Sequence, residues 1–207
     1  QPITHFLDGT SWIGTEKNGL ISYDEKNKLF KTHLKTDQDG LANPINSDRV
    51  RCIFEDGKHR LWIGFQGAGL AIYDKELESF NFFEYDNKNK NGFFSGSVLR
   101  IYEDHLGIIW IASTDGIFIY QDENNSFLNY QKSADDPFSL SDNHIRCIWE
   151  DRAHSVWLGT ESAGISVFHR SSGKFNHISQ KTFGELAPLS NTIFAFAEGN
   201  DNDIWVA

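Results

Sequence analysis

Short apolar segments bounded by polar turns run along the whole chain in groups of four. One group consists of residues 50–56 (VRCIFED), 61–65 (LWIGF), 69–74 (GLAIYD) and 80–85 (FNFFEY). The segments are rich in β-branched and aromatic residues, which suit the pleated, half-buried surface of a β-strand. None of them has the i, i+3, i+4 spacing of apolar residues that an amphipathic helix requires. The pattern therefore predicts an all-β protein made of groups of four short strands.

A tryptophan marks each recurrence of this group. The five residues Trp12, Trp62, Trp110, Trp157 and Trp205 are spaced by 50, 48, 47 and 48 residues. When the copies are aligned on the Trp, a Glu stands seven residues before it in four copies, and an Asp follows that Glu in three of them. These Glu residues are Glu55, Glu103, Glu150 and Glu198. Four strands per repeat, with turn residues at fixed offsets, are typical of the blades of a β-propeller.

We therefore predict a β-propeller of four-stranded antiparallel blades. The copies lie approximately at residues 1–46, 47–94, 95–140 and 141–189, with an incomplete copy at 190–207. The first residue aligns inside a first strand, and the last residue follows the fifth Trp by two positions. Residues 1–207 are therefore expected to form a partial propeller of about four and a half blades. A ring of seven blades, within the usual range of four to eight, would need about three more.

The repeated residues are expected to hold the blades together. The Trp and a later Phe fill the space between adjacent blades, and the Gly that follows Trp-Ile or Trp-Leu lets a neighbouring backbone approach closely. The Asp of the Glu-Asp pair caps the turn after the first strand by accepting backbone N–H groups. As an alternative, the repeated carboxylates are metal ligands or a catalytic pair. A structural role is favoured because the group recurs in almost every blade.

The composition excludes several classes of function. The formal net charge is −10 and the isoelectric point is near 5.2, which argues against binding to nucleic acid or to an anionic membrane surface. The chain has no Gly-rich phosphate loop, no zinc-type Cys or His spacing and no nucleophile elbow. We therefore predict no catalytic residue, no metal ligand and no cofactor. Cys52 and Cys147 occupy equivalent positions in repeats that are not neighbours, so buried thiols are favoured over a disulfide.

Three stretches carry a resemblance to a known family. They are IYEDHLGIIWIAS (101–113), IFEDGKHRLWIGF (53–65) with GAGLAIYD (67–74), and WIGT with GLISYD (12–15 and 19–24). This pattern resembles the two-component regulator propeller repeat. The resemblance implies the periplasmic sensor of a hybrid two-component system, in which two propellers precede a small β-sandwich domain, a membrane helix and a histidine kinase. It also implies that the sensed ligand is an oligosaccharide.

The resemblance sets the expected partners and location. The chain would be the periplasmic portion of an inner-membrane protein, and any kinase activity would lie outside these residues. Its partners would be the remaining blades and the downstream sandwich domain of the same chain, with a homodimer in the full-length protein. This segment itself would contact neither nucleic acid nor membrane. Two other functions stay open: a propeller enzyme of the lyase or glycosidase type, and a protein-interaction scaffold with an exposed apolar patch.

A ligand is expected where the repeat varies, on the face formed by the loops before the first strand and between the second and third strands. The predicted ligand-binding residues are Arg49, Arg51, Gln66, Arg100, His144, Arg146 and Glu161. The inner-strand arginines suit a uronate or a sulfate, which they would hold by paired hydrogen bonds. The alternative is that they pair with the repeated Glu residues. Phe93 and Phe94, expected to be exposed, would either stack on a sugar ring or pack against a second domain.

Overall fold

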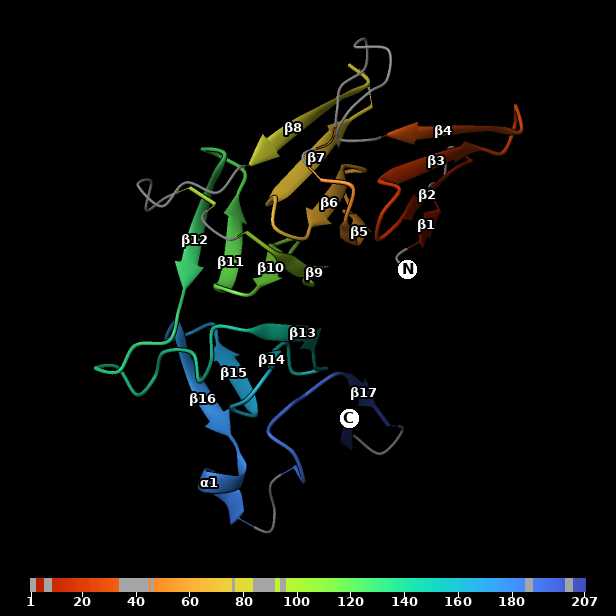
Figure 1. The fold of residues 1–207 in the computed structure, drawn as a ribbon. Coiled ribbons are helices and arrows are strands. Elements are labelled where there is room, and N and C mark those ends of the chain that lie inside the picture. Colours follow the sequence, from red (N-terminus) through yellow and green to blue (C-terminus); the bar gives the residue numbers. More distant parts are fainter. Residues whose placement is uncertain are drawn as a thin grey trace.

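Four antiparallel sheets of four strands each, and a fifth sheet of two strands, make up the fold (Figure 1). The computed structural model describes residues 3–5, 9–33, 45, 47–75, 77–83, 92, 93, 96–184, 188–199 and 203–207. Each complete sheet is a meander whose strands follow one another in chain order. The prediction of an all-β chain of four-stranded antiparallel blades is confirmed. Among the described residues, no helix is long and apolar enough to cross a membrane.

The strands have the following bounds. The first sheet contains β1 (Ile3–His5), β2 (Thr10–Gly14), β3 (Leu20–Asp24) and β4 (Leu29–His33). The second contains β5 (Val50–Glu55), β6 (Leu61–Phe65), β7 (Leu70–Asp74) and β8 (Ser79–Phe83). The third contains β9 (Val98–Glu103), β10 (Ile109–Ser113), β11 (Gly116–Gln121) and β12 (Ser126–Tyr130). The fourth contains β13 (Ile145–Glu150), β14 (Val156–Thr160), β15 (Ile165–His169) and β16 (Lys174–Ile178). A short helix α1 (Gln180–Phe183) precedes β17 (Phe196–Glu198) and β18 (Ile204–Val206).

The sheets, numbered here as blades 1 to 5 in chain order, fan out in an open arc (Figure 1). The first strand of each blade is innermost, so that β5 contacts β9 and β9 contacts β13. The fourth strands of the complete blades, such as β8 and β12, lie on the outside (Figure 1). This radial arrangement brings the first strands of successive blades together around one centre.

The space between neighbouring blades is filled by aromatic rings. Trp62 is completely buried and meets Tyr120 of the next blade edge-on, with ring centroids 4.9 Å apart. Trp110 meets Phe168 of the next blade in the same way at 5.2 Å. The repeated Phe contributes from the other side of the seam, since Phe127 lies 5.0 Å from Phe83 of the preceding blade. The predicted role of the Trp and the Phe is confirmed.

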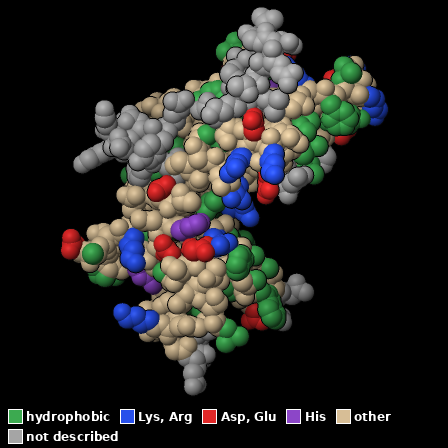
Figure 2. Space-filling view, viewed as in Figure 1, with side chains coloured by type: hydrophobic (Ala, Val, Ile, Leu, Met, Phe, Trp, Pro, Cys, Tyr) green, Lys and Arg blue, Asp and Glu red, His purple; other side chains and the backbone are tan. Residues whose placement is uncertain are grey.

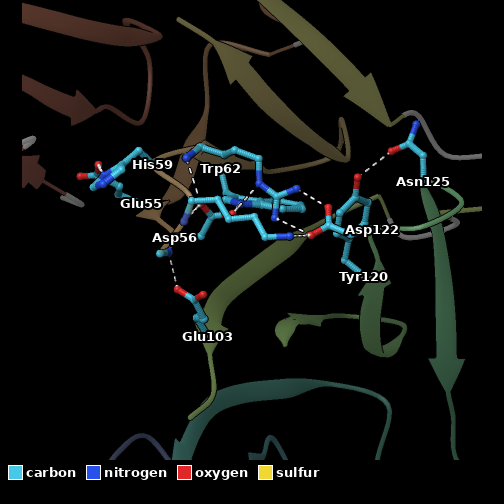
Figure 3. Close-up of polar contacts among 11 residues, drawn as sticks. Glu55, Asp56, His59, Trp62, Glu103, Tyr120, Asp122 and Asn125 are labelled. Atoms are coloured by element: carbon cyan, nitrogen blue, oxygen red, sulfur yellow. Dashed lines mark hydrogen bonds and ion pairs between the residues drawn. The ribbon is translucent and has the colours of Figure 1, made fainter. Parts of the chain in front are cut away.

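The repeated Asp joins the turn after the first strand to the Trp. One carboxylate oxygen of Asp56 accepts the backbone N–H groups of Lys58 and Arg60 at 3.0 and 2.9 Å. The other accepts the indole N–H of Trp62 at 2.8 Å (Figure 3). The same indole bond recurs from Trp110 to Asp104 and from Trp157 to Asp151. The predicted turn cap is confirmed, and it also holds the buried ring in place.

The repeated Glu also bonds across the seam to the preceding blade. Glu103 accepts the backbone N–H of Gly57 in the preceding blade at 2.6 Å (Figure 3). Glu150 does the same for the backbone N–H of His105 at 2.9 Å. Each of these carboxylates therefore fixes the turn of its neighbour, a role that was not expected from the sequence.

The Gly two residues after the Trp leaves room for neighbouring side chains. The expectation was that a neighbouring backbone approaches this Gly, and that expectation is corrected here. A methyl group at Gly64 would lie 2.5 Å from the Sγ of Cys52 and 2.6 Å from Val98 of the next blade. In the third blade Ala112 takes this position, and its cross-strand partner is the exposed Arg100 instead of a buried Cys. Cys52 and Cys147 are free and buried, and burial raises their thiol pKa values to about 12 and about 11.

We expect Gly64→Ala to destabilise the protein by about 1–3 kcal/mol, because the new methyl group overpacks a buried seam. Urea unfolding followed by Trp fluorescence measures the change. Gly96→Ala is the matched control, since the nearest atom to its added methyl group is 3.9 Å away. Equal stability of the two variants would contradict this account of the repeated Gly.

We also expect stability to fall in acid because of His33. This side chain stacks on Trp12 and shares a hydrogen bond with the hydroxyl of Ser22. Its burial lowers the pKa of the imidazole from 6.5 to about 4. The unfolded chain therefore binds a proton at a higher pH than the folded chain. The stabilisation is complete above about pH 6.5 and is lost as the pH falls towards 4, by about 2 kcal/mol at pH 5. His33→Phe should flatten this part of the pH profile in urea unfolding, and an unchanged slope would contradict the assignment.

Candidate ligand-binding site

The face that carries the predicted site is held by backbone hydrogen bonds between blades. A Gly at or just before the start of the third strand donates its N–H to a carbonyl in the approach to the next blade. Examples are Gly116 to Asn143 at 2.7 Å and Gly164 to Asn191 at 2.8 Å. Gly164 has a φ of 80°, and a methyl group there would lie 2.3 Å from the carbonyl oxygen of Ile178. Only glycine fits this position without strain. These bonds tie the described ends of the approach loops, next to the first strands, to the preceding blade.

A depression of about 540 Å³ opens on this face between the inner strands of blades 2, 3, 4 and 5. It is lined by Arg51, Gln66, Ser97, Leu99, Arg100, Thr114, His144, Arg146 and Phe194. Figure 2 shows Lys and Arg side chains, acidic side chains and His side chains gathered towards the inner ends of the blades. For a chain with a net charge of −10, three arginines around one depression are a local concentration of positive charge.

Most of the lining comes from three positions of the repeat. The position eleven residues before the Trp supplies Arg51, Leu99, Arg146 and Phe194. The position thirteen before it supplies Ser97 and His144, and the position four after it supplies Gln66 and Thr114. The residue type varies among the blades at these positions, although Arg stands twice at the first of them, whereas the surrounding structural residues recur. The depression is thus lined where the repeat varies.

A β-bulge directs the residue eleven positions before the Trp towards the depression. In β5 the pairing with β6 passes from Val50 to Cys52, so Arg51 is the extra residue. Leu99 in β9 and Arg146 in β13 are extra residues of the same kind. A bulge leaves one residue unpaired and re-aims its side chain. This explains how a residue of an innermost strand comes to line the depression.

The three arginines differ in their partners. Arg146 forms a hydrogen-bonded ion pair with Glu161 and lies 4.6 Å over the ring of Phe194. The bond from Arg146 lowers the pKa of Glu161. Arg100 donates to the carbonyl oxygen of Leu99 at 2.7 Å. Within the part of the chain that the structure describes, neither Arg51 nor Arg100 forms an ion pair, and both are exposed.

The arginines do not pair with the repeated Glu residues, which was the alternative expectation. Glu103 and Glu150 bind the turns of neighbouring blades instead, and the partner of Arg146 comes from the turn between the second and third strands. Two guanidinium groups therefore remain available to a ligand.

The loop that carries His144 is ordered by one carboxylate. Asp142 accepts the backbone N–H of His144 at 3.2 Å, and it accepts both the backbone N–H and the hydroxyl of Ser162 at 3.0 and 2.6 Å. These bonds outweigh the effect of burial, so the pKa of Asp142 lies below its ordinary value. The carboxylate is therefore ionised at neutral pH and links the approach loop to the following turn.

The structure brings most of the predicted site residues together. Arg51, Gln66, Arg100, His144 and Arg146 line the depression, and Glu161 is bonded to one of them. Arg49 is not among the lining residues, although its carbonyl oxygen accepts the N–H of Gln66 at 2.9 Å. Phe93 is buried against Phe118 and Phe127, so the expectation that it is exposed was wrong. Phe94 lies outside the described residues.

Four lining residues were missed from the sequence. They are Ser97, Leu99, Thr114 and Phe194. Each stands at the same repeat position as a residue that was predicted, so aligning all blades on the Trp would have found them. All four side chains are uncharged, and it is their position in the repeat and not their residue type that places them in the depression.

The comparisons with known proteins agree with this fold. A profile of the family described as two component regulator propeller matches residues 44–67 and 92–115, which confirms the expected type of repeat. A histidine kinase, P4, of Formosa agariphila is 28% identical over 168 residues, covering 77% of this chain and 11% of the kinase.

Solved structures show the same propeller architecture. The extracellular domain assigned to a hybrid two-component system of B. thetaiotaomicron superposes with a TM-score of 0.77 at 21% identity, covering 100% of this chain and 28% of that one. Virginiamycin B lyase from Staphylococcus aureus superposes with a TM-score of 0.68 at 17% identity, covering 99% of this chain and 61% of that one. The chain thus spans about a tenth of the matched kinase and less than a third of the matched extracellular domain.

Proposed function

We propose that this chain is part of the extracytoplasmic sensor of a hybrid two-component signalling protein, and that it binds an oligosaccharide in the arginine-lined depression. The observation that carries the proposal is the placement of Arg51, Arg100 and Arg146 around one depression, at positions where the repeat varies. A rigid repeated scaffold with variable residues at one face is the usual arrangement of a binding module.

The lining favours an oligosaccharide that carries carboxylate or sulfate groups. A guanidinium group matches both anions in geometry and holds them by paired charged hydrogen bonds. Gln66, Ser97 and Thr114 can bond to sugar hydroxyls, and the half-exposed ring of Phe194 offers an apolar surface to a sugar face. The acidic surface elsewhere on the chain would repel the same ligand, so binding is expected at this depression.

The relatives support a role in signalling. The matched family, the kinase relative and the extracellular domain of similar fold are all connected with two-component systems. A periplasmic location and transfer of the signal to a membrane-linked histidine kinase are part of the proposal. Likeness to virginiamycin B lyase at 17% identity concerns the fold alone, so we propose that the ligand is bound and released unchanged.

Calorimetric titration with matched acidic and neutral glycans tests the proposal. Galacturonate oligomers are compared with their methyl esters, and chondroitin sulfate oligomers with unsulfated chondroitin. We expect saturable binding to the carboxylated or to the sulfated member of a pair, and weaker binding to its matched partner that lacks that charge. Arg51→Gln and Arg100→Gln should each lower the affinity about 10–100-fold, since a charged hydrogen bond contributes about 1.5–3 kcal/mol.

Two further variants serve as controls. Glu161→Gln should raise the affinity, because it frees Arg146 from its ion pair. Arg152→Gln should leave affinity unchanged, since Arg152 lies in the turn after the first strand and pairs with Glu198. Equal affinity for the neutral glycans would contradict the selection of acidic groups. Absence of binding to every glycan would contradict the sensor proposal, and release of new reducing or unsaturated ends would favour an enzyme.

A further inference from the structure

Two histidines and a glutamate meet on the opposite face of the propeller, at the seam between blades 3 and 4. His105 lies in the turn after β9, His154 lies in the turn after β13, and Glu150 ends β13. One ligand atom from each residue lies within 4.8 Å of the others. The two imidazole rings stack with centroids 3.6 Å apart.

Both Nδ1 atoms lie close to one oxygen of the glutamate. The Nδ1 of His105 lies 2.5 Å from the Oε1 of Glu150, and the Nδ1 of His154 lies 3.7 Å from the same oxygen. Ligand atoms around a tetrahedral Zn²⁺ ion are about 3.3 Å apart, given bond lengths of about 2.0–2.1 Å. Movements of less than 1 Å would therefore equalise these two separations. Both histidines are exposed, so water could complete the coordination.

The glutamate is held in position by bonds that a metal ligand commonly has. Its Oε2 accepts the backbone N–H of His105 at 2.9 Å, and its Oε1 accepts from Arg170 at 3.0 Å. Arg170 also donates to Asp104 at 2.8 Å. The two carboxylates carry two negative charges against the one positive charge of the guanidinium, so the cluster keeps a net negative charge. Such outer bonds orient a carboxylate towards a metal ion.

The other seams provide an internal comparison. At the seam between blades 2 and 3, Gly57, Glu103 and Gly107 stand at the three matching positions, and Glu103 makes the same bond to the backbone N–H of Gly57. That seam has the structural bond without the histidines. The bond from the repeated Glu to the backbone of the preceding blade therefore forms without a histidine. The presence of both His105 and His154 at the seam between blades 3 and 4 needs another explanation.

We propose that His105, Glu150 and His154 form a binding site for a divalent transition-metal ion. Among ions that do not change oxidation state, Zn²⁺ suits these three donors best. Two imidazole nitrogens and one carboxylate oxygen are a donor set that suits Zn²⁺, Cu²⁺ and Ni²⁺ and disfavours Mg²⁺ and Ca²⁺. The bound ion joins the turns of two blades. Its binding consequently stabilises the folded protein against separation of that seam.

Titration of the tag-free protein with ZnCl₂ in a calorimeter tests the site, and thermal unfolding with and without ZnCl₂ provides a second measurement. We expect one Zn²⁺ per chain, a rise in melting temperature, tighter binding of Cu²⁺ than of Zn²⁺, and no response to Mg²⁺ or Ca²⁺. His154→Gly should lower the Zn²⁺ affinity at least 10-fold and abolish the thermal shift.

The substitution His154→Gly is chosen because it should not impair folding. His154 has a φ of 63°, and Gly107 takes the equivalent position in the preceding blade with a φ of 75°. His59→Gly is the matched control, since His59 has a φ of 61° and also contacts a glutamate, Glu55, at 2.8 Å. The residue that matches His105 in its neighbouring blade is Leu7, which cannot bind a metal. No saturable Zn²⁺ binding, or equal losses in the two variants, would overturn the proposal.

Discussion

The architecture depends on a carboxylate placed at the foot of a buried tryptophan. Asp56 and Asp104 are almost completely buried, a situation that is costly unless every oxygen is hydrogen-bonded. Backbone N–H groups and the indole N–H supply most of these bonds, and a guanidinium adds the opposite charge. Burial alone would raise the pKa of Asp104, but the bonds from Trp110, the backbone and Arg170 outweigh it and lower that pKa. The carboxylate therefore stays ionised. Its hydrogen bonds hold the indole ring, the turn after the first strand and a side chain of the next blade in fixed positions relative to one another.

The guanidinium reaches this carboxylate from either side of the seam. Between blades 2 and 3 it belongs to Arg60 of the same turn, which also binds Asp122 of the next blade (Figure 3). Between blades 3 and 4 it belongs to Arg170 of the next blade, at the position that Asp122 occupies one repeat earlier. Both groups lie over the Trp ring, at 5.2 and 5.9 Å from its centroid. Both seams therefore place a guanidinium against the buried Asp and the Trp ring. The residue that supplies this guanidinium comes from a different blade in each seam.

The blades could be predicted from the sequence because period, strand length and turn chemistry are local properties. The Trp, the Asp turn and the Phe were assigned correctly for the same reason. What the sequence did not reveal depends on contacts between repeats: the bond from Glu103 to Gly57, the exchange of Arg60 for Arg170, and the pairing of His105 with His154. Spacing within one repeat cannot show that two turns 49 residues apart meet. The site was found only in part, because the bulge that aims Arg51 and Leu99 follows from strand register and not from residue type.

Strand β13 connects the two candidate sites. Arg146 lies near one of its ends and faces the arginine-lined depression, whereas Glu150 lies at the other end and faces the two histidines. The two residues are four positions apart along the strand, a distance of about 13 Å. Arg100 and Arg146 belong to blades 3 and 4, as do His105 and His154, so a ligand spanning the arginines and an ion between the histidines would both hold the same seam closed. Binding at one face would then favour binding at the other only to the extent that the seam opens in the free protein, because a coupling free energy requires two states that both ligands distinguish.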